Sequence, residues 1–346
     1  MTVRTILVCE AQVPFVTGGA ESLARSLVGR LRAAGYETDL VSVPYKWYPK
    51  DEILAHAAAW RLLDLSEASQ RPVDLLIATK FPTYFTRHPN KVVWLLHQHR
   101  AAYELCGSDY SDFTHTDEDV GLRARLHDLD REMLGECGRR YTISANTAAR
   151  LRQFNDVEAE PLYHPPPLAD TLRHESYGAY LLSVGRLEPI KRVELAIEAM
   201  RHADEPLRLL IAGAGGHGES LRRTASAAGV THRVEFLGRV SDQALVDLYA
   251  NALAVVYPPY DEDYGYVTLE AFLARKPVVS ATDAGGPLEF VEHEVSGLVC
   301  EPDADAFAAA FNSLADRARA RALGDAAYER ARAVTWDGVI EKLVSG

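Results

Sequence analysis

The sequence predicts an α/β fold made of two doubly wound domains, each built on a parallel sheet. Short apolar runs rich in β-formers alternate with helical patterns along the chain, which is typical of parallel strands covered by helices. This alternation starts again near residue 180, after the stiff segment 163–168 (YHPPPL). A length of 346 residues also suits about two domains. We therefore expect domains at residues 1–165 and 175–330, followed by a last helix at 331–346.

The composition argues against several classes of protein. Apolar residues make up 47% of the chain, and a net charge of −12 argues against a nucleic-acid binder, since such binding depends on clustered Lys and Arg. The four cysteines are dispersed without metal-ligand or redox spacing, so we expect free thiols, no zinc site and a reducing compartment. The first apolar run is too short for a signal peptide, and none reaches the roughly 18 residues of a membrane span, so a cytoplasmic protein is expected.

The first half begins with a strand, a glycine-containing loop and a helix, the start of a right-handed βαβ unit. The strand at residues 5–9 is apolar, and a leucine at every fourth position from Leu23 to Leu31 marks one helix face. Gly18 and Gly19 lie between them, where such a sheet would place a diphosphate or a developing charge. The alternative is a tight turn, and the pattern is not the GxGxxG of a dinucleotide site. The other elements expected in this half are strands at 38–43, 73–78, 91–96 and 141–144 and a helix at 52–67.

Two histidines follow the predicted strand at 91–96, at the carboxyl end where open α/β sheets place ligand residues. We expect the rings of His97 and His99 to point to opposite sides, so that only one faces a ligand, and we assign that role to His97. The alternative is a histidine whose ring is satisfied by a neighbouring carbonyl.

Three regions outside these motifs carry expectations about structure alone. The acidic segment 108–119 is expected to be a mobile surface loop, with a solvated run at 117–119. Asn146 is expected to cap the helix that follows the strand at 141–144. The tail from 303 to 344 is expected to be helical throughout, with breaks near Gly324 and at 335–336.

The second half starts with a strand at 180–184, a turn and an amphipathic helix. Arg186 and Lys191 lie in that turn, and two cations between a strand and a helix indicate an anion site. As ordinary surface charges they would oppose the helix dipole, which weakens that alternative. The elements that follow are strands at 208–212, 234–237, 253–256, 277–281 and 297–300, and a helix at 243–251 capped by Ser241.

Residues 213–218 (GAGGHG) match GxGxxG, the pattern of a nicotinamide-dinucleotide site. That pattern normally opens the first βαβ unit of a chain, whereas here it follows the second strand of the second domain. We therefore do not expect a nicotinamide cofactor at this turn.

The stretch 257–276 (YPPYDEDYGYVTLEAFLARK) joins a strand to a helix and carries two carboxylates around a glycine. Its spacing places Glu262 in the loop and Glu270 within the helix. Gly265 lets the backbone approach a ligand, and the first amides of the helix would hold anionic oxygens such as a diphosphate. A carboxylate that accepts from paired hydroxyls beside such a site suits a sugar nucleotide. The alternative is a pair of solvated charges at a helix entry.

Taken together, the motifs of the second half resemble glycosyltransferase family 4, whose members are retaining, sugar-nucleotide-dependent enzymes with the GT-B fold of two Rossmann-like domains that face each other across a cleft. The matching segments, in family order, are 183–186 (SVGR) with Lys191, 213–218, 236–238 (FLG), 262–271 (EDYGYVTLEA) and 285–289 (GGPLE). In the first half, 18–21 (GGAE) and His97 match more loosely. The family usually has Gly and Phe where this chain has Asp263 and Tyr264, a departure that bears on the identity of the donor.

The resemblance implies how the second domain would bind a nucleotide sugar. Arg186 and Lys191 would hold the diphosphate, Glu270 would accept hydrogen bonds from the ribose, and Glu262 would face the hydroxyls of the donor sugar. The residues whose backbone would meet the base or the sugar are Gly238, Arg239, Val240, Tyr264, Gly265, Tyr266 and Val267.

The resemblance also gives the first domain a part in the site. Gly18 and Gly19 would approach the phosphate from this domain, and His97 would lie near the reacting sugar. The last helix, entered at 335–336, would cross back onto the first domain.

The implied reaction is a retaining, metal-independent transfer of a sugar from a UDP- or GDP-linked donor to a carbohydrate, lipid-linked or small-molecule hydroxyl acceptor, in bacterial glycan or glycoconjugate synthesis. Fixed cations and helix amides would stabilise the leaving nucleoside diphosphate. No cofactor is expected beyond the donor substrate, and membrane contact would be peripheral at most, because no basic amphipathic helix is evident. The alternatives are an epimerase or hydrolase on the same plan, and a non-catalytic sugar-nucleotide-binding partner.

Overall fold

The chain folds into two compact units. The computed structural model describes residues 3–16 and 18–345, and it divides Met1–Pro167 with Thr335–Gly346, called unit 1, from Leu168–Val334, called unit 2. Each unit is built around its own six-stranded sheet, in which all neighbouring strands run parallel. The predicted α/β class with two doubly wound parallel sheets is confirmed.

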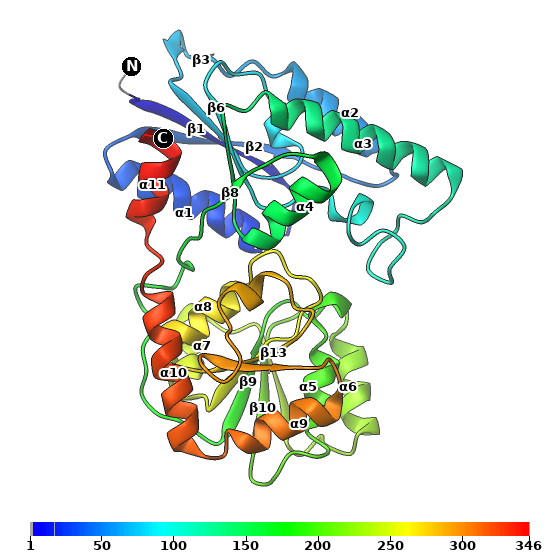
Figure 1. Ribbon diagram of the computed structural model, residues 1–346, viewed down its shortest axis with the longest axis vertical. Helices are drawn as coiled ribbons and strands as arrows, with labels where there is room; N and C mark the ends of the chain where they lie inside the picture. The colour runs from blue at the N-terminus through cyan, green and yellow to red at the C-terminus, as the bar shows by residue number, and fades with distance from the viewer. Residues whose placement is uncertain (1–2, 17, 346) are drawn as a thin grey trace. The chain divides into compact units, whose positions relative to one another are not determined.

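The sheet of unit 1 has the strand order β2-β1-β5-β6-β7-β8 (Figure 1). Its strands are β1 (Thr5–Gln12), β2 (Glu37–Pro44), β5 (Leu75–Ala78), β6 (Lys91–Leu95), β7 (Arg139–Thr142) and β8 (Glu160–Pro161). β5 and β6 are buried along their whole length, which explains why their sequences are largely apolar rather than alternating. The strand order changes direction between β1 and β5, and sheets of this kind bind ligands beyond the carboxyl ends of the strands at such a point.

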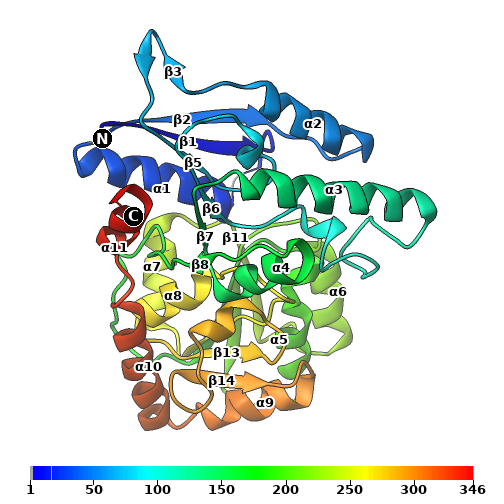
Figure 2. The ribbon, with the colours of Figure 1, turned by 45° about the horizontal axis from the view of Figure 1, so that its top comes forward.

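The last helix of the chain is part of unit 1. The helices of this unit are α1 (Gly19–Ala33), α2 (Asp51–Leu62), α3 (Asp117–Gly135), α4 (Ala145–Asn155) and α11 (Trp336–Ser345), with the 3₁₀ turns η1 (Thr83–Phe85) and η2 (Arg100–Ala102). Helix α11 packs beside α1 (Figure 2). The Lys342 carbonyl accepts from Arg139 Nη1 at 3.2 Å and from Tyr141 Oη at 3.1 Å, and the Trp336 ring meets the Trp94 ring edge-on. These contacts anchor the end of the chain to β6 and β7.

Two local expectations for unit 1 were wrong. The predicted helix at 52–67 ends early, because a short antiparallel hairpin of β3 (Glu67–Ala68) and β4 (Arg71–Pro72) follows it. The cap of α4 is Ser144 rather than Asn146, since the Ser144 side chain accepts from the amide of the third helical residue. Ser144 has the extended backbone that a cap requires, directly before the helix.

The acidic run at 117–119 was expected to be solvated, and this is wrong for Asp119. Its side chain accepts from Lys50 Nζ at 2.7 Å, and from the amide and hydroxyl of Thr114 at 2.7 and 2.8 Å. These donors, the lysine first, lower the pKa of Asp119 to about 2. The carboxylate therefore fastens the segment before α3, and only 4% of Asp119 is exposed.

The sheet of unit 2 has the strand order β11-β10-β9-β12-β13-β14 (Figure 1). Its strands are β9 (Tyr180–Val184), β10 (Arg208–Ala212), β11 (Val234–Gly238), β12 (Ala254–Val256), β13 (Val278–Ala281) and β14 (Gly297–Cys300). The order changes direction between β9 and β12, so the loops after these two strands flank the expected position of a ligand.

Helices cover both faces of the unit 2 sheet. Those of one face are α5 (Val193–Ala199), α6 (Gly218–Ala227) and α9 (Ala304–Ser313), and those of the other are α7 (Asp242–Asn251), α8 (Tyr266–Leu273) and α10 (Arg317–Ala331) (Figure 1). The 3₁₀ turns η3 (Pro189–Lys191) and η4 (Gly286–Glu289) lie in the loops after β9 and β13. Ser241 caps α7 as predicted, accepting from Ala244 N at 3.3 Å.

The predicted break near Gly324 was wrong, because Gly324 lies inside α10. A Cβ at this position would stand 2.1 Å from the carbonyl oxygen of Arg275, so glycine is needed for the close approach of the helix to the turn before β13. The helical tail is instead interrupted between α9 and α10, at residues 314–316. Among the helices of residues 3–16 and 18–345, none has the length and apolar character needed to span a membrane.

Candidate functional site

The loop after β12 is held by backbone hydrogen bonds on both of its sides. On one side, Tyr260 N donates to Ile190 O in the loop after β9, at 2.8 Å. On the other side, Glu262 N donates to Ala284 O in the loop after β13, also at 2.8 Å. The three loops therefore continue the order β9-β12-β13 beyond the strand ends, at the position where α/β sheets bind ligands.

Lys191 and Glu262 form an ion pair between two of these loops. The ammonium of Lys191, the last residue of η3, donates to Oε2 of Glu262. The two side chains are 14% and 17% exposed, so solvent screens their attraction less than it screens a surface pair. Arg186 lies outside this pair, since its 52% exposed side chain bonds Glu188 at 2.7 Å. The structure thus brings together one predicted cation and one predicted carboxylate and leaves the other cation at the surface.

Arg192 is the buried cation of this region, and the sequence did not single it out. Its guanidinium donates to the carbonyls of Pro258 and Pro259, at 2.9 Å each, and forms a two-pronged ion pair with Asp283. The residue has φ +49° between η3 and α5, so the chain turns sharply directly after Lys191. Arg192 therefore clamps all three loops, and its only signal in the sequence is its place beside Lys191.

Gly265 begins α8 in a conformation that requires glycine. Its φ is +81°, and a Cβ would stand 2.9 Å from atoms of both Tyr257 and Pro287. Tyr266 and Val267 form the first turn of α8, whose amide groups lack helical partners and carry the positive end of the helix dipole. The Tyr264 ring is buried and packs edge-on against Phe290 and Tyr266. Of Tyr264, the backbone rather than the ring is thus placed to meet a ligand.

Glu270 lies inside α8 and is buried, although it is a carboxylate. Its Oε2 accepts from the hydroxyl of Tyr249, on α7, at 2.7 Å. Burial raises the pKa of Glu270 to about 7, while the bond from Tyr249 acts in the opposite direction. With this pKa, the carboxyl is close to half ionised at neutral pH, and a further hydroxyl donor would favour its ionised form.

The loop after β11 lies at the same carboxyl edge. Gly238 ends β11 with φ +67°, and its carbonyl accepts from Gly213 N at 2.8 Å. Arg239 and Val240 follow directly, before the cap of α7. These three residues therefore lie between the carboxyl end of β11 and the start of α7.

The GxGxxG segment at 213–218 is explained by packing. A Cβ on Gly213, which has φ +145°, would stand 1.8 Å from the Gly185 carbonyl oxygen. A Cβ on Gly215 would stand 2.3 Å from the Leu187 carbonyl oxygen. The glycines let the loop after β10 approach the backbone of the loop after β9, which is where Lys191 lies.

In unit 1, Gly18 and Gly19 open α1 at the carboxyl end of β1. Gly18 is the cap residue, and its amide donates to Oε2 of Glu21 at 2.9 Å. The other oxygen of Glu21 accepts from Lys80 Nζ, in the loop after β5, at 3.0 Å. Burial opposes ionisation of Glu21, but Lys80 and the backbone donors outweigh it and lower the pKa of the carboxyl. Lys80, which the sequence did not single out, thus joins the two loops where the strand order changes.

The loop after β6 places the two histidines in different surroundings. Nδ1 of His97 lies 2.6 Å from the Gln98 carbonyl oxygen, and the ring is half-buried. Nδ1 of His99 lies 3.1 Å from Tyr45 Oη, and its ring packs against Phe81 among further aromatic rings. Burial lowers the pKa of His99 to about 4, so this ring is neutral and structural.

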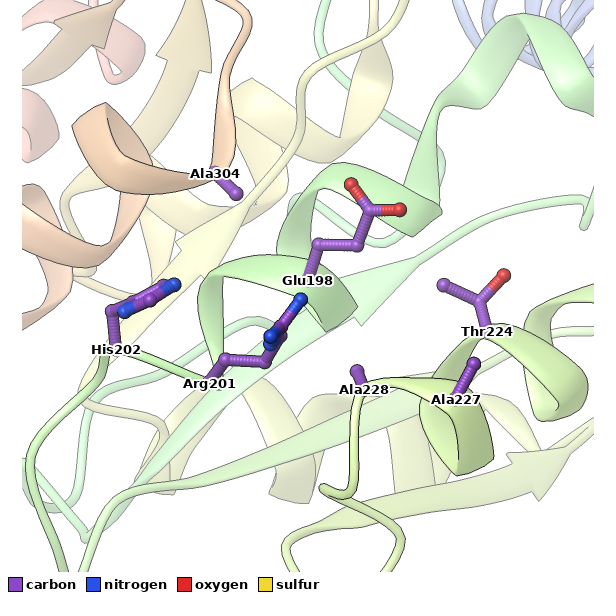
Figure 3. Close-up of a pocket in the computed structure, with 7 residues that line it drawn as sticks. All are labelled: Glu198, Arg201, His202, Thr224, Ala227, Ala228 and Ala304. Carbon is purple, nitrogen blue, oxygen red and sulfur yellow. The ribbon is translucent and has the colours of Figure 1, made fainter.

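A surface pocket of unit 2 lies away from these residues (Figure 3). It is formed at the carboxyl ends of α5 and α6 and the start of α9, and its lining residues are Glu198, Arg201, His202, Thr224, Ala227, Ala228 and Ala304. Because α5 begins at the carboxyl edge of the sheet and ends at the opposite edge, this pocket is separate from the candidate site.

Residues 170–330 match the family model described as Glycosyl transferases group 1. This range covers almost all of unit 2, including the loops after β9, β12 and β13. Unit 2 belongs to the glycosyl transferases group 1 family. The predicted resemblance is confirmed at this level.

Curated relatives of the glycosyl transferases group 1 family match part of the chain. Human alpha-1,3/1,6-mannosyltransferase ALG2 is 32% identical over 154 residues, which cover 40% of this chain and 37% of that protein. D-inositol 3-phosphate glycosyltransferase of Corynebacterium diphtheriae is 34% identical over 172 residues, which cover 47% and 40%. The matches thus span well under half the length of these two relatives.

Solved structures match nearly the whole chain. Sucrose-phosphate synthase from Thermosynechococcus elongatus has a TM-score of 0.75 at 20% identity and covers 98% of this chain and 97% of its own. HepE of Anabaena, in complex with UDP and glucose, has a TM-score of 0.69 at 17% identity, covering 96% and 95%. At such identity the likeness concerns the fold, which is GT-B with two Rossmann-like domains, as predicted.

The glycosyl transferases group 1 domain therefore carries the predicted ligand residues at three positions along the carboxyl edge of the unit 2 sheet. Lys191 and Glu262 are in contact, Glu270 lies within α8 on Tyr249, and Gly238 begins the loop after β11. Within the described ranges 3–16 and 18–345, no group of three or more His, Cys, Asp or Glu is arranged to hold a metal ion.

Proposed function

We propose that the protein is a glycosyltransferase that moves a sugar from a nucleoside-diphosphate sugar to a hydroxyl acceptor, with retention of anomeric configuration and without a metal ion. The observation that carries the proposal is the ion pair of Lys191 and Glu262 in the loops that lead to η3 and α8, at the point where the strand order of unit 2 reverses. The membership of unit 2 in the glycosyl transferases group 1 family supports it.

Lys191 and the first turn of α8 would bind the diphosphate. A cation and helix amides both favour anionic oxygens, and they interact more strongly as the bond to the sugar breaks and charge grows on the leaving phosphate. Arg186, which is exposed and paired only locally, would reach the diphosphate from the surface. Glu262 holds Lys191 in place before the donor arrives, and would then accept from hydroxyls of the donor sugar.

Glu270 would accept hydrogen bonds from the ribose. Two neighbouring hydroxyls match the two oxygens of a carboxylate, and each donor favours the ionised form of the carboxyl. Tyr249 already donates to one oxygen and fixes the orientation of the group. The base would meet the backbone of Gly238, which ends β11, and of Arg239 and Val240, which follow it.

The reaction that we propose breaks the bond between the anomeric carbon and the diphosphate oxygen and forms a bond from that carbon to the acceptor oxygen on the same face. The proton of the acceptor hydroxyl passes to the departing phosphate oxygen. Gly18, Gly19 and His97 of unit 1 would serve the same reaction, His97 near the sugar and the glycines near the phosphate. The donor would be UDP- or GDP-linked, in line with the UDP named for HepE, and the product a bacterial glycan or glycoconjugate.

The test is release of nucleoside diphosphate from UDP-glucose and GDP-mannose, with and without a panel of sugar, polyol and lipid-linked sugar acceptors. Acceptor-dependent release with a retained anomeric centre is the expected result. Equal release without any acceptor would show a hydrolase, conversion of the donor sugar without net release would show an epimerase, and binding without turnover would show a non-catalytic protein. Arg208→Ala is the control variant, because it removes a cation paired with Glu235 at the opposite edge of the same sheet.

A further inference from the structure

A buried chain of hydrogen bonds in unit 1 runs from Gln98 to the carboxylate of Asp130. Gln98 Nε2 donates to Asn155 Oδ1 at 2.8 Å, and Asn155 Nδ2 donates to Tyr103 Oη at 3.3 Å. The hydroxyl of Tyr103 in turn donates to Asp130 Oδ2 at 2.5 Å. None of the four residues is more than 2% exposed. They come from four separate segments, namely the loop after β6, the residue after η2, α3 and α4.

Every donor in this chain points toward Asp130. The orientation of the Asn155 amide is fixed independently, because its Nδ2 also donates to the His127 carbonyl at 3.1 Å. Hydrogen bonds aligned in one direction polarise one another, so the carboxylate strengthens each bond back to Gln98. The three bonds therefore connect the side chain of Gln98 to the carboxyl group of Asp130 in one continuous chain.

Burial of these four polar side chains in an apolar core is energetically unfavourable. The aromatic and aliphatic core of unit 1 encloses them, and a buried carboxyl there is disfavoured in its charged form. Burial raises the pKa of Asp130 to about 7 despite the bond from Tyr103. Apolar side chains of the same shape would fill this space without the penalty, and polar groups kept in such places commonly set a particular geometry.

Gln98 connects the chain to His97. The Gln98 carbonyl oxygen lies 2.6 Å from Nδ1 of His97. A carbonyl oxygen only accepts hydrogen bonds, so Nδ1 carries a proton and is the donor in this contact. The network thus holds the side chain of Gln98, and the backbone carbonyl of Gln98 accepts the hydrogen bond from Nδ1 of His97.

We propose that Asp130, Tyr103, Asn155 and Gln98 form a positioning network that fixes the orientation of His97 and keeps its proton on Nδ1. The role of His97 in transfer rests on the proposed function, whereas its tautomer does not. Asp130, Tyr103 and Asn155 act through Gln98 and are positioning residues.

The first test is the tautomer of His97, observed by NMR of protein labelled with ¹⁵N-histidine, with signals assigned through His97→Gln. Tyr103→Phe breaks the chain and keeps the ring that stacks on His127. Wild type is expected to carry the proton on Nδ1, and Tyr103→Phe to show a mixture of the two tautomers. Asp130→Asn, which keeps the shape of the side chain, is the second variant.

The control is Tyr141→Phe, which removes a hydroxyl that donates to the Lys342 carbonyl elsewhere in unit 1. It should leave the His97 signals unchanged. Unchanged His97 tautomers in folded Tyr103→Phe and Asp130→Asn proteins would overturn the proposal.

The second test is a double-mutant cycle in transfer kinetics. Tyr103→Phe is expected to lower kcat by about tenfold with little change in donor KM, because a displaced group loses transition-state contacts. In a His97→Ala background it should cause no further loss. An additive loss would overturn the positioning role. A His97→Ala variant with full activity would instead refute the part of the proposed function that involves His97, and the NMR result would still decide the network.

Discussion

Lys191 and Glu262 are 71 residues apart in the sequence, and their side chains are joined by an ion pair at the carboxyl edge of the unit 2 sheet. The pair links the loop after β9 to the loop after β12, the two loops that flank the reversal of strand order. Because both side chains are largely buried, removal of either leaves the other poorly solvated. The site therefore depends on both residues, even before a ligand binds.

Lys191→Ala is expected to lower kcat/KM for transfer by about 100-fold or more, because the variant lacks the fixed cation for the leaving diphosphate. Steady-state kinetics with UDP-glucose and GDP-mannose measure the loss, and circular dichroism shows whether unit 2 is folded. The matched variant Arg208→Ala should stay within about twofold of wild type. Similar activities of the two variants would refute the assignment of Lys191.

Glu270→Gln is expected to weaken binding of the nucleoside diphosphate by about 10- to 100-fold, since a hydrogen bond to a charged group contributes about 1.5–3 kcal/mol. Isothermal titration calorimetry with UDP and GDP at pH 8 measures the change.

The companion variant Tyr249→Phe removes the hydroxyl that donates to Glu270 and that lowers the pKa of the carboxyl. This variant should bind UDP and GDP weakly at pH 7 and recover its affinity at higher pH, whereas Glu270→Gln should not recover its affinity. Wild-type affinity of Glu270→Gln would contradict the ribose role.

Two buried carboxyls are each expected to contribute stability that falls as the pH rises from about 4 to 7, whereas His99, whose pKa burial lowers to about 4, contributes in the opposite direction. Burial raises the pKa of both Asp130 and Glu270 to about 7. Between pH ~4 and ~7 the folded chain therefore holds protons that the unfolded chain has released, and the resulting stabilisation, complete below pH ~4, is lost as the pH rises through 7. Urea unfolding at pH 5 and pH 8 measures the difference.

Relative to wild type, Asp130→Asn should lack this contribution in unit 1, and Glu270→Gln should lack it in unit 2. The prediction fails if both variants keep the wild-type dependence on pH. The low pKa of Asp119, about 2, acts in the opposite direction but only in more acidic solution.

Gly213→Ala is expected to destabilise unit 2 by about 2 kcal/mol or more, because a Cβ would stand 1.8 Å from a backbone oxygen and φ is +145°. Gly216→Ala offers a control within the same motif, since nothing lies within 4 Å of its Cβ position. The effect of Gly216→Ala on the free energy of unfolding should stay within about 0.5 kcal/mol. Thermal unfolding compares them, and equal melting temperatures would argue against the packing role of Gly213.

The strands of both sheets could be predicted from local patterns because they are buried apolar runs. The strand expected at residues 180–184 is β9, with the same bounds, and the glycine and carboxylate positions around α8 followed from the strand-to-helix spacing. Helix ends were harder, because the cap at Ser144 and the interruption at 314–316 depend on single hydrogen bonds and on how neighbouring helices pack.

The partners of the site residues could not be predicted, since they come from distant parts of the chain. Tyr249 reaches Glu270 from another helix, and Lys80 reaches Glu21 across two strands. Arg192 looks like an ordinary surface charge in the sequence, and only the folded loops show that it is enclosed. Pairing over such separations depends on tertiary packing, which no local pattern encodes.

Main-chain hydrogen bonds hold the loop after β12 on both of its sides, and this bears on how a preference for one donor sugar could change. Glu262 is fixed through its own amide and through its carbonyl, which accepts from Gly286 N at 2.7 Å, so main-chain bonds hold the backbone directly before position 263. A substitution at Asp263 would therefore exchange one contact surface for another while these bonds stay in place. Under the proposed function, position 263 directly follows the residue assigned to the donor sugar, which makes it a natural starting point for directed evolution toward a different sugar.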